Sequence, residues 1–293
     1  MKGIMPAIAS PCDDNGVFLE DEFAALAENL YEQGSNGLYV CGATGDGYNM
    51  LPGERKRAVE IAVQTGRKYG GKTIAHVGTS NTRDSIGLAV HAAGAGADAV
   101  SAMPPASRNL AQLVSFYGDI ASASGLPLLV YHIPILTGRV FSVGEMLQLL
   151  NIPGVIGFKF SDWNLYFMRQ VLKQRPEIII FNGNDEFLCP GLMYGAHGGI
   201  GLNYNVFPKL FIGIYKAVGQ GDITRAMELQ NLLCDYMDVV WNYGLQACFS
   251  VIMREIGFAP QVWRKPRQEL DDRTTRRFIS QWWPRLEAIR AAV

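Results

Sequence analysis

The sequence contains little cysteine: 5 of its 293 residues, scattered along the chain with no Cys-x-x-Cys pair. An odd, scattered set argues against a disulfide framework and against a zinc ribbon, and it is typical of a protein kept in the reducing cytosol. We therefore expect a cytoplasmic location and thiols that are buried as small apolar side chains.

An excess of charge is also missing. Lys+Arg number 26 and Asp+Glu 27, which gives a net charge of −1. The chain therefore lacks the basic surplus of a nucleic-acid binder or an anionic-membrane binder. Residues 89–100 are apolar but consist mostly of Ala and Gly, and the stretch is too short to span a bilayer. We expect no nucleic-acid partner, no membrane partner and instead a small-molecule ligand.

The sequence also lacks residues spaced like the ligands of a metal site. The four histidines are His76, His91, His132 and His197, and no His-Glu-x-x-His motif or Asp-x-Asp cluster accompanies them. Zinc and calcium sites need several ligands at characteristic spacings. The sequence therefore predicts no metal site.

What is present is a regular alternation of strand-like and helical patterns over the first 220 residues. Several strand-like runs are continuously apolar, as expected for parallel strands buried on both faces. The eight runs are 4–10, 37–41, 73–78, 98–103, 127–133, 155–160, 178–182 and 198–202. The helical patterns between them are 20–33, 53–68, 82–95, 109–124, 142–150, 163–174, 186–194 and 207–218. Eight strand–helix units in order predict a TIM (β/α)₈ barrel.

The alternation stops near residue 221. Residues 222–243, 245–256 and 273–292 have helical patterns, and Asp222 is suited to cap the first of these helices. We therefore expect a catalytic barrel over residues 1–221 and a C-terminal helical appendage over residues 222–293.

Lys159 is the most informative single residue. It lies in the otherwise apolar run 155–160, where period-two alternation places Val155, Gly157 and Lys159 on one side and Gly157 leaves room in the barrel interior. A buried ammonium is costly, so burial depresses the pKa of a lysine and makes its amine nucleophilic. A Schiff base with a carbonyl substrate is one use of such an amine. A lysine that leaves the strand end for solvent is the other interpretation.

Active sites of TIM barrels lie at the carboxyl ends of the strands, which directs attention to three further motifs. Tyr131 ends one apolar run, where its phenol could transfer protons or simply pack. The turn 42–45 (Gly-Ala-Thr-Gly) offers N–H groups suited to a carboxylate, although glycines in a βα turn also serve steric needs. Asp185 and Glu186 open a helix, where capping explains them as well as ligand binding does.

Four ordered motifs together resemble the N-acetylneuraminate lyase / dihydrodipicolinate synthase family. They are residues 42–46 (Gly-Ala-Thr-Gly-Asp), 131–134 (Tyr-His-Ile-Pro), 157–159 (Gly-Phe-Lys) and 195–201 (Gly-Ala-His-Gly-Gly-Ile-Gly). The resemblance runs from residue 4 to about residue 215 and continues weakly into the tail. It implies a TIM barrel with C-terminal helices, commonly assembled as a homotetramer.

The resemblance also implies residue roles. Lys159 would form the Schiff base with pyruvate or another 2-oxo acid, and Tyr131 would transfer the proton of the substrate hydroxyl as an aldehyde leaves. No metal or organic cofactor would be needed, because the protonated imine stabilises the developing carbanion. The pyruvate unit would contact Ala43, Thr44, Ser161 and Ile200. A polyhydroxylated chain, as in the lyase branch, would contact Gly183, Asp185 and Glu186.

The lyase branch fits better than the synthase branch, because Leu136 stands where synthases typically place an arginine for a second carboxylate. N-acetylneuraminate or a related 2-keto-3-deoxy sugar acid is then the expected substrate. Three features depart from the lyase pattern. Ala43 removes one hydroxyl, Leu202 stands where lyases carry a serine, and residues 104–106 (Pro-Pro-Ala) replace a stretch that usually supplies a tyrosine from the neighbouring subunit.

Other functions stay open at this point. A condensing synthase or a dehydratase could use the same lysine imine. A phosphate-binding isomerase barrel would use the glycines of residues 195–201 but leaves Lys159 unexplained. A catalytically idle ligand-binding barrel is the third alternative, because the relay tyrosine is missing from residues 104–106.

Overall fold

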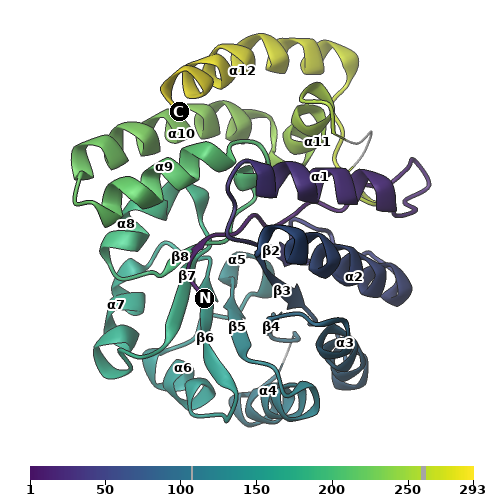
Figure 1. The fold of residues 1–293 in the computed structure, drawn as a ribbon, viewed down its shortest axis with the longest axis vertical. Coiled ribbons are helices and arrows are strands. Elements are labelled where there is room, and N and C mark those ends of the chain that lie inside the picture. Colours follow the sequence, from purple (N-terminus) through teal and green to yellow (C-terminus); the bar gives the residue numbers. More distant parts are fainter. Residues whose placement is uncertain (107, 259–261) are drawn as a thin grey trace.

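The computed structural model describes residues 1–106, 108–258 and 262–293, and it shows a parallel β-barrel surrounded by helices (Figure 1). The eight strands have the order β1-β8-β7-β6-β5-β4-β3-β2, and every neighbouring pair is parallel. The two ends of this sheet meet where Ala7 bridges Tyr39 and the Ile8 N–H donates to the Tyr39 carbonyl oxygen at 3.1 Å. The predicted (β/α)₈ barrel is confirmed.

The strands are short and lie at the predicted places. Their bounds are β1 Gly3–Ile4, β2 Gly37–Val40, β3 Lys72–His76, β4 Ala99–Ala102, β5 Leu128–His132, β6 Val155–Phe160, β7 Ile179–Asn182 and β8 Gly198–Gly199. The predictions for the first and last strands were too long. After Ile4 the next pairing is the isolated bridge of Ala7 with Tyr39, and after Gly199 the chain turns into a 3₁₀ helix at Asn203.

The helices also follow the predicted pattern. Their bounds are α1 Glu20–Glu32, α2 Pro52–Tyr69, α3 Thr82–Ala95, α4 Leu110–Ser124, α5 Pro134–Thr137, α6 Val143–Leu150, α7 Leu165–Gln174, α8 Leu188–Met193, α9 Pro208–Gly219, α10 Ile223–Tyr243, α11 Leu245–Glu255 and α12 Asp272–Ala292. The described residues also form two 3₁₀ turns, η1 Asp185–Phe187 and η2 Asn203–Asn205. The helix predicted over 186–194 is therefore divided into η1 and α8. The one-turn helix α5 was not predicted.

Side-chain caps explain where several helices begin. The side chains of Asn81, Asn109, Ser142 and Asp222 each accept a hydrogen bond from the backbone N–H three residues further on. Such caps satisfy N–H groups that have no partner inside the helix. The cap predicted at Asp222 is confirmed.

One prediction about β6 was wrong. A register shift against β5 lies between Leu128 and Leu129, so that Leu128 pairs with Val155 and Leu129 with Gly157. Because this irregularity interrupts the alternation, Val155 packs in the outer core while Lys159 faces the barrel interior. Gly157 does not leave interior space either: a Cβ there would lie 1.8 Å from the Ile179 carbonyl oxygen of β7.

Three groups of buried side chains hold the barrel together. The largest lies between the strands and the surrounding helices, and a smaller one fills the barrel interior around Tyr39, Leu129 and Phe181. The third joins α8 and α9 to α10, α11 and α12, with Trp282 fully buried. The tail helices are thus packed on the barrel through a continuous apolar core, whereas a domain boundary at residue 221 stays a prediction.

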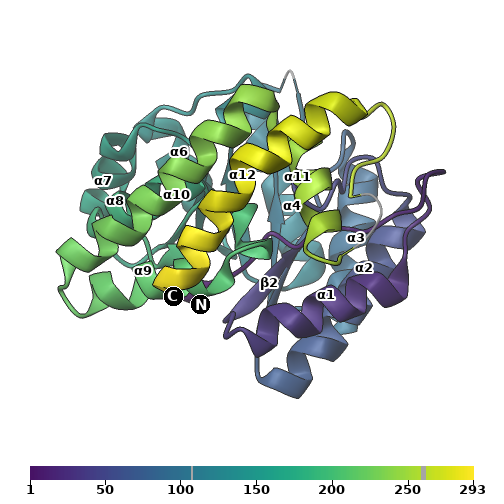
Figure 2. The ribbon, with the colours of Figure 1, turned by 90° about the horizontal axis from the view of Figure 1, so that it is seen from above.

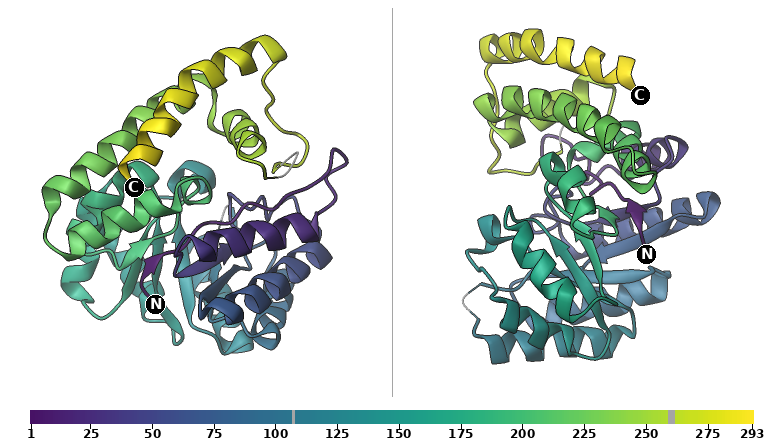
Figure 3. Two further views of the ribbon diagram at one scale, coloured as in Figure 1. Left: turned by 45° about the horizontal axis from the view of Figure 1, so that its top comes forward. Right: turned by 90° about the vertical axis from the view of Figure 1, so that its left-hand side faces the viewer.

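The tail forms a layer over one side of the barrel. Helix α10 lies on α9, and α12 lies along α10 as the outermost helix (Figures 2 and 3). Helix α11 and residues 263–264 approach the carboxyl-end loops of the first strands. All five cysteines are free thiols; four are buried, as predicted, whereas Cys234 is only half-buried. No helix among the described residues is both long and apolar enough to cross a membrane.

Candidate active site

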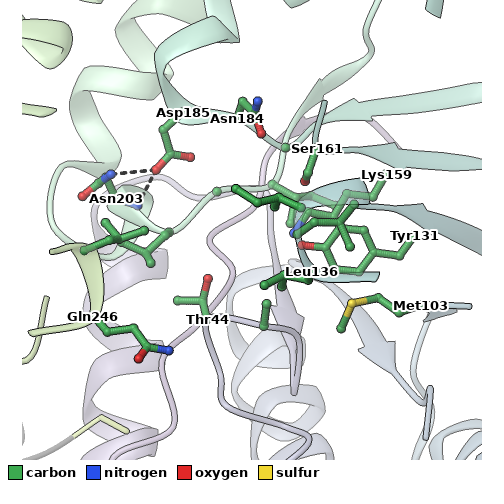
Figure 4. A pocket seen from close by; sticks show the side chains of 18 of the residues that line it. Thr44, Met103, Tyr131, Leu136, Lys159, Ser161, Asn184, Asp185, Asn203 and Gln246 are labelled. Atoms are coloured by element: carbon green, nitrogen blue, oxygen red, sulfur yellow. Dashed lines mark hydrogen bonds between the residues drawn. The ribbon is translucent and has the colours of Figure 1, made fainter. Parts of the chain in front are cut away.

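A cavity of about 450 Å³ opens at the carboxyl ends of the strands. The structure brings all of the predicted site residues to its wall: Ala43, Thr44, Tyr131, Lys159, Ser161, Gly183, Asp185, Glu186 and Ile200. They come from the ends of β2, β5, β6, β7 and β8, so the barrel topology gathers residues that are far apart in sequence. Figure 4 shows Lys159 and Tyr131 side by side, with Asp185 across the cavity.

Lys159 lies at the centre of this arrangement. On β6, Lys159 pairs in register with Tyr131 on β5, so the two side chains project from neighbouring strands to the same face. The Lys159 Nζ lies 4.2 Å from the ring centre of Tyr131 and 4.5 Å from that of Tyr39. Only 3% of the lysine is exposed. The amine is therefore held between two aromatic faces at the floor of the cavity.

This burial changes the chemistry of the amine. Desolvation lowers the pKa of Lys159 to about 7, and the nearby Asp185 carboxylate opposes that shift. A lysine of ordinary pKa near 10.4 is almost entirely protonated at neutral pH, whereas an amine with a pKa near 7 is about half neutral. Because the neutral amine is the nucleophile, the site is prepared for attack on a carbonyl carbon.

The two phenols beside the lysine differ in what their hydroxyl groups do. The Tyr39 hydroxyl donates to Ser101 Oγ at 3.1 Å inside the barrel. Tyr131 lines the cavity instead, and burial raises its pKa above the ordinary value. Tyr131 is therefore protonated at neutral pH and available as a proton donor, while Tyr39 contributes its ring.

The turn after β2 offers an anion-binding surface. The N–H groups of Ala43 and Thr44 donate no hydrogen bond within the described part of the chain, and the Thr44 side chain lines the cavity. Tight folding of the turn depends on Gly47, because a Cβ there would lie 2.0 Å from the Cys41 carbonyl oxygen. Free N–H groups in a compact turn suit a carboxylate.

The tail anchors this turn, which sequence reasoning did not predict. Asp46 accepts hydrogen bonds from the Arg264 N–H and the Asn49 side chain, both at 2.8 Å. The Arg264 guanidinium is buried, with Nη1 3.8 Å from Asp46 Oδ2 and Nη2 3.9 Å from Glu54 Oε1. Trp263, the residue before Arg264, lines the cavity. No local pattern relates residue 264 to residue 46, so this contact required the fold.

Asp185 is held by a second link to the tail. Its Oδ2 accepts hydrogen bonds from the Asn203 backbone N–H at 2.7 Å and from the Asn203 side chain at 2.8 Å (Figure 4). The Asn203 Oδ1 in turn accepts from the Tyr236 hydroxyl of α10 at 3.0 Å. Burial raises the pKa of Asp185 to about 7, against the lowering effect of the Asn203 bonds. Asn203 was not predicted as a site residue.

Two glycines allow these side chains to fit. A Cβ at Gly183 would lie 2.0 Å from Ser161 Oγ, and a Cβ at Gly201 would lie 1.8 Å from Asp185 Oδ1. Ile200 is fully buried and Glu186 is half-buried, and both line the cavity. Gly183, the second residue of the segment 182–186 (Asn-Gly-Asn-Asp-Glu), therefore leaves room for Ser161.

The pH dependence of turnover follows from the Lys159 pKa. We expect kcat/KM for a 2-oxo acid to rise with pH through about 7 and then level off, because deprotonation generates the nucleophile. Tyr39, Tyr131 and Asp185 face the amine, and among them the Asp185 charge raises its pKa. The measurement is kcat/KM between pH 5 and 9 with coupled detection of the keto acid released.

The Asp185→Asn variant tests the sign of that effect. Loss of the carboxylate should lower the Lys159 pKa further and move the acid limb to lower pH. Asp162→Asn is the matched control, because the Asp162 carboxylate pairs with His132 Nε2 at 3.2 Å and has no assigned effect on Lys159. An acid limb that moves to higher pH in Asp185→Asn would contradict this account.

The fold and site define a class: a (β/α)₈ barrel that holds a buried lysine of lowered pKa at the carboxyl ends of its strands. The comparison with protein families identifies the group within that class. Residues 1–281 match the dihydrodipicolinate synthetase family. The chain belongs to this family.

Individual relatives agree with this assignment. The chain is 33% identical over 279 residues to the N-acetylneuraminate lyase of Citrobacter koseri, with 93% of each chain covered. It is similar to the crystal structure of CdNal from Clostridium difficile in complex with mannosamine, with a TM-score of 0.91, 28% identity, and 97% of this chain and 99% of that chain covered. The wild-type sialic acid aldolase of Ruminococcus gnavus gives a TM-score of 0.91 at 26% identity, with coverage of 99% and 96%. A further structure of that aldolase is described as its catalytic lysine mutant.

Proposed function

We propose that the protein is a class I aldolase, a carbon–carbon lyase that splits a 4-hydroxy-2-oxo acid into pyruvate and an aldehyde and can also run in reverse. The observation that carries the proposal is the buried Lys159, whose pKa is lowered to about 7 and whose Nζ faces the cavity. Membership of the family and the similarity to named lyases and aldolases support it.

The reaction begins with carbonyl condensation. The neutral Lys159 amine attacks the C2 carbonyl of the 2-oxo acid, and loss of water with uptake of one proton from the solvent leaves a protonated imine. The imine accepts the electron pair of the C3–C4 bond as that bond breaks, which gives a neutral enamine. Tyr131, protonated in the free protein, gives up its proton to water once the iminium lies beside it, and the resulting phenolate takes the proton of the C4 hydroxyl as the aldehyde carbonyl forms. Protonation of the enamine at C3 and hydrolysis of the imine release pyruvate and restore the lysine.

The surrounding residues position this chemistry. The N–H groups of Ala43 and Thr44 and the Thr44 hydroxyl would bind the substrate carboxylate, with Ser161 and Ile200 beside the pyruvate unit. The charged iminium would lie where the Nζ now lies, 4.2 Å from the Tyr131 ring centre. A cation at that distance lowers the pKa of the phenol, so it favours the phenolate needed to accept the hydroxyl proton.

Three further properties are part of the proposal. No metal or organic cofactor is required, because the iminium itself is the electron sink. A homotetramer and a cytoplasmic location are expected from the resemblance and from the free cysteines. Gly183, Asp185 and Glu186 would lie on the aldehyde side of the site, and the lyases named above make a sugar acid one candidate substrate.

Borohydride trapping tests the proposal. Reduction in the presence of pyruvate should fix a pyruvate-derived adduct on Lys159 and inactivate the protein, because reduction converts the imine to a stable amine. The measurement is peptide mass analysis, with a sample lacking pyruvate and the peptide carrying the ion-paired Lys72 as controls. An unmodified Lys159, or an adduct on another lysine, would overturn the assignment. An adduct with no cleavage of any 4-hydroxy-2-oxo acid would favour the idle ligand-binding barrel.

A further inference from the structure

The mouth of the cavity is walled by apolar side chains. Tyr48, Ile135, Leu136, Trp163 and Trp241 all line it, and each leaves between 46% and 66% of its surface exposed. They come from the turn after β2, from α5, from the loop after β6 and from α10. Large apolar side chains that gather on one exposed surface mark a binding site. Their position at the mouth of the Lys159 cavity places that site on the path of the substrate.

The wall continues inward as an apolar surface. Leu202 follows β8, Met237 lies on α10, and Leu245 begins α11; all three line the same cavity. In addition, Trp263 is almost fully buried there, with its indole N–H donating to the Gln246 carbonyl oxygen at 3.0 Å. The tail helices therefore close the cavity with alkyl and indole groups, in contrast to the polar turn that holds Thr44.

Several polar atoms deeper in the wall are already engaged within the protein, whereas the buried Asp185 Oδ1 and Ser161 Oγ have no partner among the described residues. The Asp185 Oδ2 is bonded to Asn203, whose side-chain oxygen is occupied by Tyr236. Both oxygens of Asp46 accept hydrogen bonds, from Asn49 and Arg264. These free polar atoms are few in a wall that is mostly apolar, so a chain of several hydroxyls would lose more hydrogen bonds to water than it could regain, at a cost in free energy for each unpaired group.

We infer that the aldehyde part of the substrate carries an apolar alkyl or aryl group rather than a polyhydroxylated chain. This inference rests on the proposed function and specifies the substrate class of the same site. The side chains of Glu186, Asn184 and Gln246 lie in the wall as well and can bind a polar group on that part of the substrate. The geometry thus separates a polar end for the 2-oxo acid from an apolar end for the aldehyde.

Condensation assays test the inference. Pyruvate is offered with benzaldehyde or hexanal, and in parallel with N-acetylmannosamine or arabinose, and the 4-hydroxy-2-oxo acid products are quantified. In each case C3 of the enamine bonds to the aldehyde carbon, whose oxygen takes up a proton. We expect kcat/KM for the apolar aldehydes to exceed that for the sugars at least tenfold. A preference for the sugars, equal values, or no condensation of the apolar aldehydes would overturn the inference.

Variants of the apolar wall test which side chains determine the preference for apolar aldehydes. Trp163→Ala should lower kcat/KM for benzaldehyde about tenfold, in the range of apolar-pocket discrimination, while leaving the KM for pyruvate unchanged. Leu202→Ser should shift the preference toward the sugars. Trp283→Ala is the matched control, because Trp283 is a partly exposed tryptophan of α12 that does not line the cavity. If Trp163→Ala changes only the oligomeric state, a partner subunit covers the apolar mouth and the inference fails.

Trapping on the same preparations separates the two proposals. An adduct on Lys159 with pyruvate and borohydride, together with a preference for sugars, would leave the aldolase function intact and overturn only the apolar aldehyde site. Absence of the adduct would overturn the function and the inference that rests on it.

Discussion

Replacing Lys159 by alanine is expected to abolish turnover, with kcat/KM reduced by about 10⁴-fold or more and no pyruvate adduct after borohydride treatment. The imine lowers the barrier by accepting the electron pair of the breaking carbon–carbon bond, and no other nucleophile among the described cavity residues lies between the rings of Tyr39 and Tyr131. Without the covalent intermediate the whole catalysed pathway is lost, and not merely a single contribution to its rate. Cleavage kinetics and adduct mass together measure the effect.

Lys159→Met is the matched variant, which removes the amine while preserving the packing of the fold. Methionine has a similar length and no charge, so it removes the amine without opening a large cavity. Because a buried amine pays a desolvation cost when charged, we expect the free energy of unfolding to be equal to or higher than that of the parent protein. Residual turnover within about a hundredfold of the parent in either variant, with the fold intact by circular dichroism, would show that Lys159 is not the nucleophile.

The position of this lysine was largely predictable from sequence. An isolated lysine in an apolar strand, at the end of the sixth of eight strand–helix units, is placed by topology at the carboxyl end of a barrel. The rule of alternation failed locally, because the irregularity in β6 near Gly157 reverses which residues face inward before Lys159 is reached. Gly157 is the only signal in the six residues of that strand, because a glycine inside a strand often marks a bulge, but the place of the register shift is decided by the pairing with β5.

The supports of the site could not be predicted in the same way. Tyr236 acts on Asp185 through Asn203, and Arg264 holds the turn that contains Thr44, yet these partners are separated in sequence by tens to hundreds of residues. Local propensity carries no information on such contacts. The tail was correctly predicted to be helical. Which of its apolar side chains reach the cavity, however, depends on how α10 packs against α9. Sequence patterns thus located the reacting groups, and the tertiary structure specified their surroundings.

Tyr131→Phe is expected to lower kcat for cleavage by about 10²- to 10⁴-fold while leaving the Lys159 adduct with pyruvate in place. The ring that packs on the Lys159 Nζ is kept, and only the hydroxyl that takes the C4 proton is lost. Since the barrier is raised after imine formation, the variant should still be inactivated by borohydride and pyruvate. Steady-state cleavage and the rate of trapping, measured on one preparation, separate the two steps.

Tyr39→Phe provides the comparison that makes this result specific. Its ring lies 4.5 Å from the same Nζ, but its hydroxyl is bonded to Ser101 Oγ inside the barrel and is directed away from substrate. Removing that hydroxyl leaves Ser101 with one hydrogen bond fewer, at a cost of about 1 kcal/mol in stability, and should change kcat less than tenfold. If both variants lose activity equally, the phenols act only by enclosing the lysine. A loss confined to Tyr131→Phe assigns the proton transfer to Tyr131, because the two variants differ in the direction of one hydroxyl group.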